Sequence, residues 1–221
     1  MSNWAIIFDV DGVLLELTRA EEELFFQPFA SRIDANRLSR DWNSYKIRND
    51  EEIVKEIVAR YHLPASETEA ITVEYLALLE SELASRLKSE RIAGAGELLV
   101  ALAPTARLGI ATANFRRAAA LRLQQAGMWA AVSGLAHGAD GGGHKSDILA
   151  RAIAQAGVPA DRVIFIGDNV SDVVAGFQNK AHFIGFSREA ARRRTLAAAG
   201  ATKISASHEQ TFTILKDMVR P

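Results

Sequence analysis

A run of four apolar residues that leads directly into two carboxylates sets narrow limits on the fold of this chain. Residues 5–8 read Ala-Ile-Ile-Phe, and Asp9, Val10, Asp11 and Gly12 follow. A short, unbroken apolar run is typical of a strand buried on both faces, as in the centre of a parallel sheet, and Gly12 favours a turn after it. We therefore expect Asp9 and Asp11 at the carboxyl end of a buried strand, the edge where open α/β sheets bind ligands.

The two neighbouring carboxylates favour a small set of chemistries. They repel each other unless they share a proton or a cation. Mg²⁺ commonly takes one or two protein carboxylates and fills its other positions with water and substrate phosphate. A carboxylate can also act as a covalent nucleophile and form an aspartyl phosphate. The alternative for Asp9 and Asp11 alone is a solvated Asp-x-Asp-Gly turn after a strand.

From residue 91 onward, short apolar runs alternate with longer segments of helical spacing. The expected strands are 107–111, 130–135, 162–166, 182–186 and 202–204. The expected helices are 94–103, 115–126, 145–156, a segment ending near 178, 188–199 and 209–219. Strands that alternate with helices indicate right-handed crossovers and a parallel sheet. The fold class is therefore α/β, with a Rossmann-like parallel sheet.

Residues 16–90 interrupt this pattern because every regular segment in them has helical spacing. The polar and aromatic stretch 40–48 reads as a loop between two of these helices. We interpret 16–90 as an inserted, all-helical domain, and 1–15 together with 91–221 as the α/β core.

Local signals predict where the inserted helices begin and end. Pro28 ends or kinks the first helix. Asn49 or Asp50 caps the second, because both side chains can accept hydrogen bonds from the first turn. Ser66 opens the third, with Glu69 three residues later as the second half of a capping box.

Composition excludes several function classes. The chain has 221 residues, a formal net charge of −1 and no cysteine. The charge provides no global field for nucleic acid or an anionic membrane. The absence of cysteine rules out disulfides, thiolate catalysis and zinc–thiolate sites. No apolar run reaches the length of a membrane span, and the N-terminus lacks a signal-peptide pattern, so we expect a cytoplasmic protein that binds neither membrane nor nucleic acid.

Polar side chains follow three of the expected strands, and a lysine begins one of the helices. They are Asp9 and Asp11, then Thr112 and Asn114, then Asp168 and Asp172, with Lys145 at the helix start. Parallel strands bring their carboxyl ends to one edge of a sheet. Carboxylates, a hydroxyl, an amide and an ammonium group should therefore converge there, although they are far apart in the sequence.

This set resembles the haloacid dehalogenase-like hydrolase superfamily over nearly the whole chain. The motifs are Asp9-Val10-Asp11-Gly12, Thr112, Lys145 and Gly167-Asp168-x-x-x-Asp172, in the family's order and spacing. The helical insertion after the first motif is similar to the family's cap domain of the type placed there.

The resemblance implies a role for each catalytic residue. Asp9 would be the nucleophile that accepts a phosphoryl group. Asp11 would be the general acid and base, protonating the leaving oxygen and later activating water. Thr112 and Lys145 would bind the phosphoryl oxygens.

The resemblance also implies a Mg²⁺ site. The ion would be held by the Asp9 carboxylate, the Asp11 backbone carbonyl and Asp168, with Asp172 as a ligand or as a support for the ligands. Together with Lys145, the metal would offset the negative charge of phosphate and of Asp9, which is what phosphoryl transfer needs.

Simpler interpretations stay open for several residues. Thr112 can close a turn, Lys145 can be an ordinary lysine at a helix start, and Asp172 can cap a helix. Asn114 is expected either to bind substrate or to cap the helix that follows it. The arginines at 192–194 are expected on a solvated helix face.

The resemblance also implies that loops of the cap contact the leaving group of the substrate, and the segment 42–48 is the candidate loop. Tyr45, Lys46 and Arg48 would read hydroxyls or a carboxylate of the substrate. The alternative is an exposed loop with no such role.

The leading functional hypothesis is a Mg²⁺-dependent phosphatase for a small phosphorylated metabolite, similar to phosphoglycolate-phosphatase-like members of the family and monomeric or homodimeric. A phosphomutase like β-phosphoglucomutase shares all four motifs and is the first alternative. A haloacid dehalogenase is disfavoured, because it needs no acid at Asp11. A non-catalytic binding protein on the same fold is the third alternative.

Overall fold

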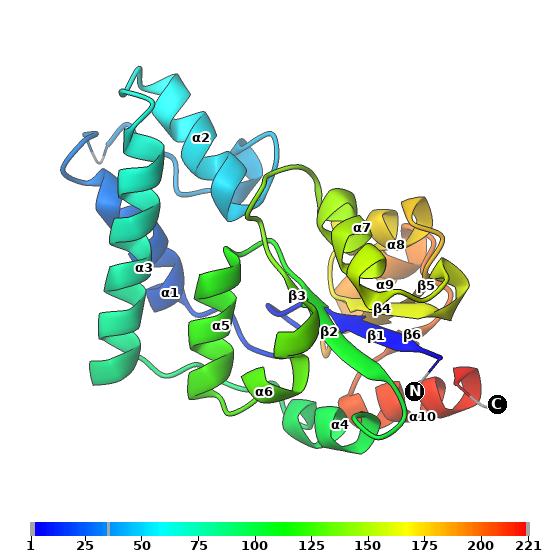
Figure 1. Ribbon diagram of the computed structural model, residues 1–221. Helices are drawn as coiled ribbons and strands as arrows, with labels where there is room; N and C mark the ends of the chain where they lie inside the picture. The colour runs from blue at the N-terminus through cyan, green and yellow to red at the C-terminus, as the bar shows by residue number, and fades with distance from the viewer. Residues whose placement is uncertain (1–2, 35, 220–221) are drawn as a thin grey trace.

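The computed structural model describes residues 3–34 and 36–219, and it confirms the α/β fold with a parallel sheet. One sheet has six strands in the order β3-β2-β1-β4-β5-β6 (Figure 1). The strands are β1 Ala5–Phe8, β2 Arg107–Ala111, β3 Ala136–His137, β4 Val163–Gly167, β5 His182–Phe186 and β6 Ile204–Ser205. The first strand of the chain thus lies in the middle of the sheet, buried along its whole length.

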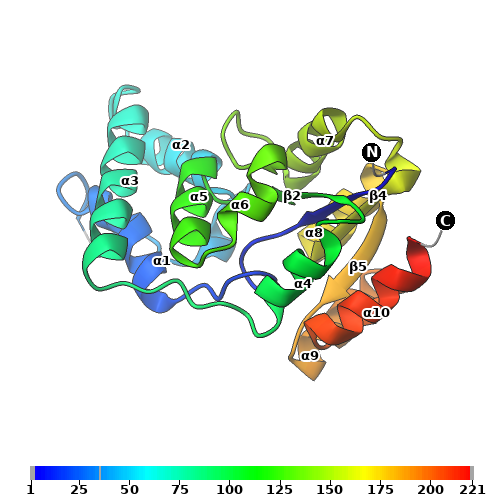
Figure 2. The ribbon, with the colours of Figure 1, turned by 60° about the horizontal axis from the view of Figure 1, so that its bottom comes forward.

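Helices cover both faces of the sheet. On one face lie α4 Ala95–Leu102, α6 Trp129–Val132 and α10 His208–Met218; on the other lie α7 Lys145–Ala156, α8 Val170–Gln178 and α9 Ala190–Ala198. Figure 2 shows α4 and α10 together on one side of the sheet. Alternate residues of β1 serve the two faces: Ile6 and Phe8 pack towards α4 and α10, and Ala5 and Ile7 towards α7 and α8.

The described residues of the inserted segment form three α-helices beside the sheet, α1 Arg19–Phe26, α2 Asp50–Arg60 and α3 Glu67–Ser85 (Figure 1). Their apolar side chains make a hydrophobic cluster of their own. The two chain segments that lead into and out of the insertion lie side by side, because Leu15 pairs with Arg91 and the Glu16 N–H donates to the Glu90 carbonyl.

One helix outside the insertion also belongs to this cluster. Helix α5, Arg116–Gln125, and its N-cap residue Phe115 contribute Phe115, Ala118 and Leu121 to it, while Ala119 and Leu123 face the core under the sheet.

Most of the expected helix ends are confirmed. Helix α1 ends at Phe26 and a 3₁₀ turn holds Pro28. The Asn49 side chain caps α2 by accepting from the Glu52 N–H. The capping box at Ser66 is wrong, because the Ser66 backbone is itself helical (φ −61°, ψ −21°) and its side chain makes no capping hydrogen bond.

The strand expected at 130–135 is also wrong. These residues form α6 and a 3₁₀ turn, and β3 is only the dipeptide Ala136–His137. The buried side chains are Val132 and Leu135, three residues apart. That spacing belongs to one face of a helix, whereas a half-buried strand would bury every second residue. Across the described part of the chain, no helix is both long and apolar enough to cross a bilayer.

Candidate active site

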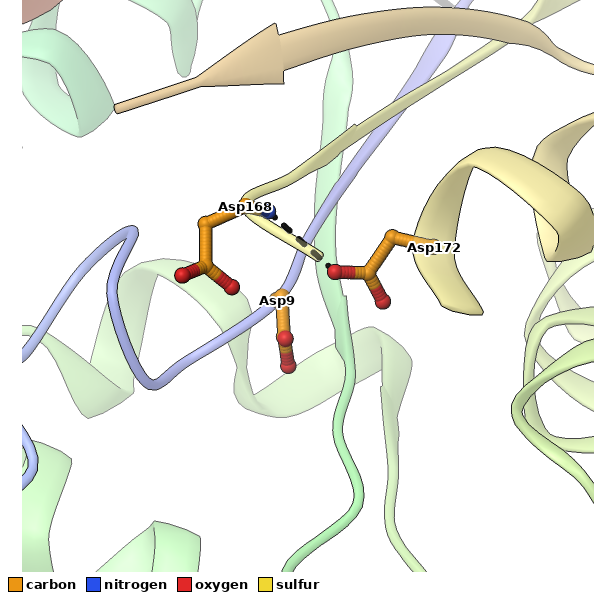
Figure 3. Close-up of side chains that lie close together, drawn as sticks. All are labelled: Asp9, Asp168 and Asp172. Carbon is orange, nitrogen blue, oxygen red and sulfur yellow. Dashed lines mark hydrogen bonds between the residues drawn. The ribbon is translucent and has the colours of Figure 1, made fainter. Parts of the chain in front are cut away.

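Three aspartates meet at the carboxyl edge of the sheet. Asp9 follows β1, Asp168 follows the adjacent strand β4, and Asp172 lies in the first turn of α8 (Figure 3). Phe8 and Ile166 are in register, so the two strands end level with each other. One carboxylate oxygen from each aspartate lies within 4.8 Å of the others. Hard oxygen donors at this spacing could hold a metal cation.

The Lys145 ammonium lies within the aspartate cluster. Lys145 is the first residue of α7, and its Nζ is 2.8 Å from Asp9 Oδ1 and 3.0 Å from Asp172 Oδ1. Burial alone would lower the pKa of Lys145, but the two carboxylates raise it, so the side chain is held charged. Lys145 therefore does more than begin a helix.

Two buried carboxylates, Asp9 and Asp172, share the one positive charge of Lys145, and the partly buried Asp168 adds a third carboxylate to the cluster. Burial raises the pKa of Asp9 well above its usual range, against the opposing effect of Lys145. Burial and the neighbouring Asp172 raise the pKa of Asp168 to about 6. A bound cation would remove this excess negative charge, so the donor set fits a divalent metal such as Mg²⁺.

Asp172 has a capping role as well as its contact with Lys145. Its Oδ2 accepts a hydrogen bond from the Asp168 N–H at 3.2 Å (Figure 3). The same oxygen accepts from the Asn169 N–H at 3.0 Å, and the two bonds fix the turn between β4 and α8. The turn after β1, which holds Gly12, lies close to the Asp168 side chain. A Cβ on Gly12, whose φ is +75°, would lie 2.3 Å from Asp168 Oδ2, so only glycine fits there.

The Asp11 carboxylate lies two residues after Asp9 in the sequence but has different partners, Asn114 before α5 and Arg122 on α5. Asn114 Nδ2 donates to Asp11 Oδ2 at 2.9 Å, and Arg122 Nη1 lies 2.7 Å from Asp11 Oδ1. Asn114 does not cap α5, whose N-cap residue is Phe115 with no side-chain capping bond. The capping alternative for Asn114 is therefore wrong.

A cavity of about 390 Å³ opens over these residues. Its floor includes Asp9, Asp11, Lys145 and the buried Thr112, whose hydroxyl also accepts from the Asn114 N–H at 3.2 Å and so helps to close the turn after β2. The cavity thus brings together Asp9, Asp11, Thr112, Lys145 and Asp168, and Asp172 lies beside it in contact with Lys145.

Of the three residues of the insertion that were expected to contact substrate, two lie at the cavity. Lys46 and Arg48 line the cavity, as expected. Tyr45 does not: it is buried in the helical cluster, its hydroxyl donates to the Ser39 carbonyl at 2.5 Å, and the Arg60 guanidinium lies over its ring. The prediction that Tyr45 contacts substrate is therefore wrong, because its ring belongs to the hydrophobic cluster of the insertion and does not line the cavity.

Arg192 is a site residue that the sequence interpretation assigned to a solvated face. It lines the cavity, its Nε donates to the Asp168 carbonyl at 2.9 Å, and the same atom is 3.3 Å from Asp168 Oδ2. The triplet 192–194 carries no signal for which of its arginines turns inward.

Asp50, Glu21 and Arg122 are buried polar residues at the site with no motif to reveal them. The Asp50 carboxylate accepts from the Phe115 N–H at 2.7 Å, and its own N–H donates to the Ala113 carbonyl at 2.9 Å. Burial raises the pKa of Asp50 to about 8. The first turn of α2 is thereby tied to the loop that carries Thr112 and Asn114.

Comparison with known proteins matches the chain to one family of hydrolases. A family model described as haloacid dehalogenase-like hydrolase matches residues 5–178, and a second, described as HAD-hydrolase-like, matches residues 142–216. No curated protein matches the chain.

Several solved structures share the fold over nearly the whole chain. A putative β-phosphoglucomutase from Bacteroides vulgatus is 17% identical, with TM-score 0.72 and coverage of 100% of this chain and 91% of that one. A predicted phosphatase from Clostridium acetobutylicum is 18% identical, with TM-score 0.71 and coverage of 98% and 100%. A HAD family hydrolase from Deinococcus radiodurans with bound phosphate and sodium is 20% identical, with TM-score 0.63 and coverage of 100% and 98%. At these identities the likeness establishes the fold.

Proposed function

The chain belongs to the haloacid dehalogenase-like hydrolase family, and on this basis we propose that it is a Mg²⁺-dependent phosphatase of a small phosphorylated metabolite. The observation that carries the proposal is the placement of Asp9 in the cavity floor, beside Lys145 and the other two aspartates. A similar structure, the Deinococcus radiodurans hydrolase, has phosphate bound.

In the proposed reaction the chain's own groups move the phosphoryl group and the protons. An Asp9 oxygen forms a bond to phosphorus while the bond to the leaving oxygen breaks, and Asp11 gives that oxygen its proton. Water then attacks the aspartyl phosphate, Asp11 takes a proton from it, and inorganic phosphate leaves with Asp9 restored. Lys145 and Thr112 bind the phosphoryl oxygens throughout.

The metal would be held by Asp9, Asp168 and the Asp11 backbone carbonyl, with Asp172 as a ligand or support. When bound, it supplies positive charge that offsets phosphate and the aspartates.

The cavity supports a small substrate with a polar or anionic leaving group. Its volume of about 390 Å³ suits a metabolite rather than a polymer. Lys46 and Arg48, on the wall formed by the helical insertion, are the groups we assign to the leaving group. We treat 16–90 as a cap domain on a core of 1–15 plus 91–221. A cytoplasmic location and a monomeric or homodimeric state stay predictions.

A phosphomutase is the second candidate, because the chain is similar to a putative β-phosphoglucomutase. The two reactions share the aspartyl phosphate and differ in its acceptor, which is water in a phosphatase and a sugar phosphate in a mutase. The presence of Asp11 disfavours a dehalogenase, and the complete set of motif residues disfavours a non-catalytic protein.

The deciding experiment measures phosphate release from a panel of phosphorylated metabolites with Mg²⁺ and with chelator. We expect Mg²⁺-dependent release that falls at least about 10³-fold in Asp9→Asn, which keeps the shape of the side chain but not its nucleophilicity. Asp161→Asn, at an exposed position away from the cavity, serves as the control. Unchanged release in Asp9→Asn would remove the nucleophile assignment. No release by the folded wild type would favour the mutase, tested by exchange between sugar-phosphate isomers.

A further inference from the structure

Arg122 is a buried arginine whose contacts all lead to the active site or to the helical insertion. Its side chain projects from α5 and the residue is only 2% exposed. Nε donates to Glu21 Oε1 at 2.6 Å, and Nη2 donates to the Glu16 carbonyl at 2.9 Å. Nη1 donates to Asn114 Oδ1 at 3.1 Å and is 2.7 Å from Asp11 Oδ1. Each guanidinium nitrogen therefore has an oxygen partner.

We propose that Arg122, held in place by Glu21, is a positioning residue that fixes the Asp11 carboxylate for proton transfer to and from substrate. The inference rests on the proposed phosphatase function and deepens it. Asp11 and Asn114 complete a closed triangle with Arg122, since Asn114 Nδ2 donates to Asp11 Oδ2. Both oxygens of Asp11 are thus held from the α5 side, which leaves little freedom for the carboxylate to rotate.

Glu21 anchors the arginine from the opposite side. It is 4% exposed, and its second oxygen accepts from both the N–H and the hydroxyl of Thr18, each at 2.9 Å. Glu21 is therefore fixed at the start of α1 by the helix cap itself. A continuous chain of contacts therefore connects the N-cap of α1 to Asp11 through Glu21 and Arg122.

Holding α5 against the insertion would not require a contact with Asp11. The same helix has a second ion pair to the insertion, between Arg117 and Glu80 of α3, and both of these side chains are more than half exposed. A buried charge is costly, and its removal leaves the partners uncompensated. The chain nevertheless places a buried guanidinium against the carboxylate that the proposed reaction uses as acid and base.

The role predicts a dependence on the leaving group. An alkoxide needs a proton to leave, whereas a dinitrophenolate does not. The value of kcat/KM covers only the steps up to departure of the leaving group, so it excludes the later attack of water. A misplaced Asp11 should therefore reduce kcat/KM for an alkyl phosphate and spare dinitrophenyl phosphate.

The test compares Arg122→Met and Arg122→Lys with the control Arg117→Gln on the best alkyl monophosphate of the panel and on 2,4-dinitrophenyl phosphate. For Arg122→Met we expect kcat/KM to fall about 10- to 100-fold on the alkyl phosphate and less than about threefold on the dinitrophenyl ester. Arg122→Lys should recover part of the loss, and Arg117→Gln should match the wild type on both esters. Equal losses on the two esters, or no loss on either, would overturn the proposal.

Crystal structures of the same variants separate this inference from the phosphatase assignment. If the wild type hydrolyses neither ester, the proposed function fails, but the positioning role still requires the Asp11 carboxylate to shift in Arg122→Met while Asp9 stays in place. An unmoved Asp11 would refute the role whatever the activity. If Arg122→Met does not fold, the kinetic comparison and the crystal structure are obtained with Arg122→Lys, because this variant keeps the buried positive charge.

Discussion

Asp50 shows how a single buried carboxylate can tie stability to pH in this protein. It comes from the insertion, yet both of its hydrogen bonds go to the loop after β2. Burial raises its pKa to about 8 from a reference value of 3.8, with nearby Asp11 acting in the same direction. At neutral pH the folded protein therefore favours the protonated Asp50, whereas the unfolded chain favours the ionised form.

The sign of the effect follows from this difference. Between pH 4 and pH 8 the folded state binds a proton that the unfolded state has lost, so Asp50 makes the protein less stable as pH rises through this range. Asp50→Asn keeps an acceptor for the Phe115 N–H but cannot ionise. We expect the unfolding free energy of Asp50→Asn, relative to the wild type, to rise by about 2–4 kcal/mol from pH 5 to pH 8.

Urea unfolding of both proteins at the two pH values measures this difference directly. The exposed Asp161→Asn, measured at the same two pH values, provides the comparison. A difference for Asp50→Asn that stays constant, or falls, would show that Asp50 is ionised in the folded protein.

At the residue scale, the sequence predicted the polar side chains that follow the strands, but not the buried side chains that hold these polar groups in place. Asp9, Thr112 and Asp168 are predictable because parallel strands share one edge. Arg122 and Glu21 are separated by 101 residues, and their pairing depends on how α5 packs against α1. A contact between residues so far apart has no signature in the local spacing of the sequence, so it could not be predicted.

At the element scale, the fit between β2 and the turn before β3 depends on one glycine. A Cβ on Gly109 would lie 2.3 Å from the carbonyl oxygen of Leu135 and 2.6 Å from Leu135 Cγ. The segment 130–135 was expected as a strand because it is one of the short apolar runs that alternate with helices, and periodicity over so short a run does not separate strand from helix. The helical turn that forms instead brings Leu135 directly over the glycine.

Gly109→Ala should therefore destabilise the protein by about 1–3 kcal/mol, because the added methyl group overlaps the main-chain oxygen of Leu135, which cannot rotate away. Gly134 lies in the same turn with nothing within 4 Å of its added Cβ, so Gly134→Ala is the matched control and should change stability by less than about 0.5 kcal/mol. Thermal and urea unfolding give both values. Equal effects of the two substitutions would mean that β2 and the turn separate more easily than the structure indicates.

At the scale of the whole molecule, the insertion and the α/β core share helix α5. One side of α5 joins the cluster of the insertion and the other joins the core under the sheet. The start of α2 adds polar contacts across the same boundary: Asn49 Nδ2 donates to the Gly143 carbonyl at 2.6 Å, and Glu51 accepts from the Gly141 N–H at 2.7 Å. The sequence predicted an insertion from its change in periodicity, but a change in periodicity does not reveal which flanking helix the insertion packs against.

This shared helix predicts that the insertion and the core unfold together. Trp42 packs against the cluster of the insertion, and Trp129 packs against the core. Substituting two of the three tryptophans (Trp4, Trp42 and Trp129) by phenylalanine leaves one reporter at a time. In urea, fluorescence from Trp42 alone and from Trp129 alone should give the same midpoint and the same slope, as a two-state transition requires. If the Trp42 signal changed at lower urea, the insertion would unfold while the sheet persists, and α5 would have to part from one of its two clusters.

Leu121→Ala removes a contact between α5 and the insertion and leaves the contacts of α5 with the core in place. If the two parts are coupled, the substitution should lower the Trp42 midpoint and the Trp129 midpoint equally; if they are not coupled, it should lower only the Trp42 midpoint.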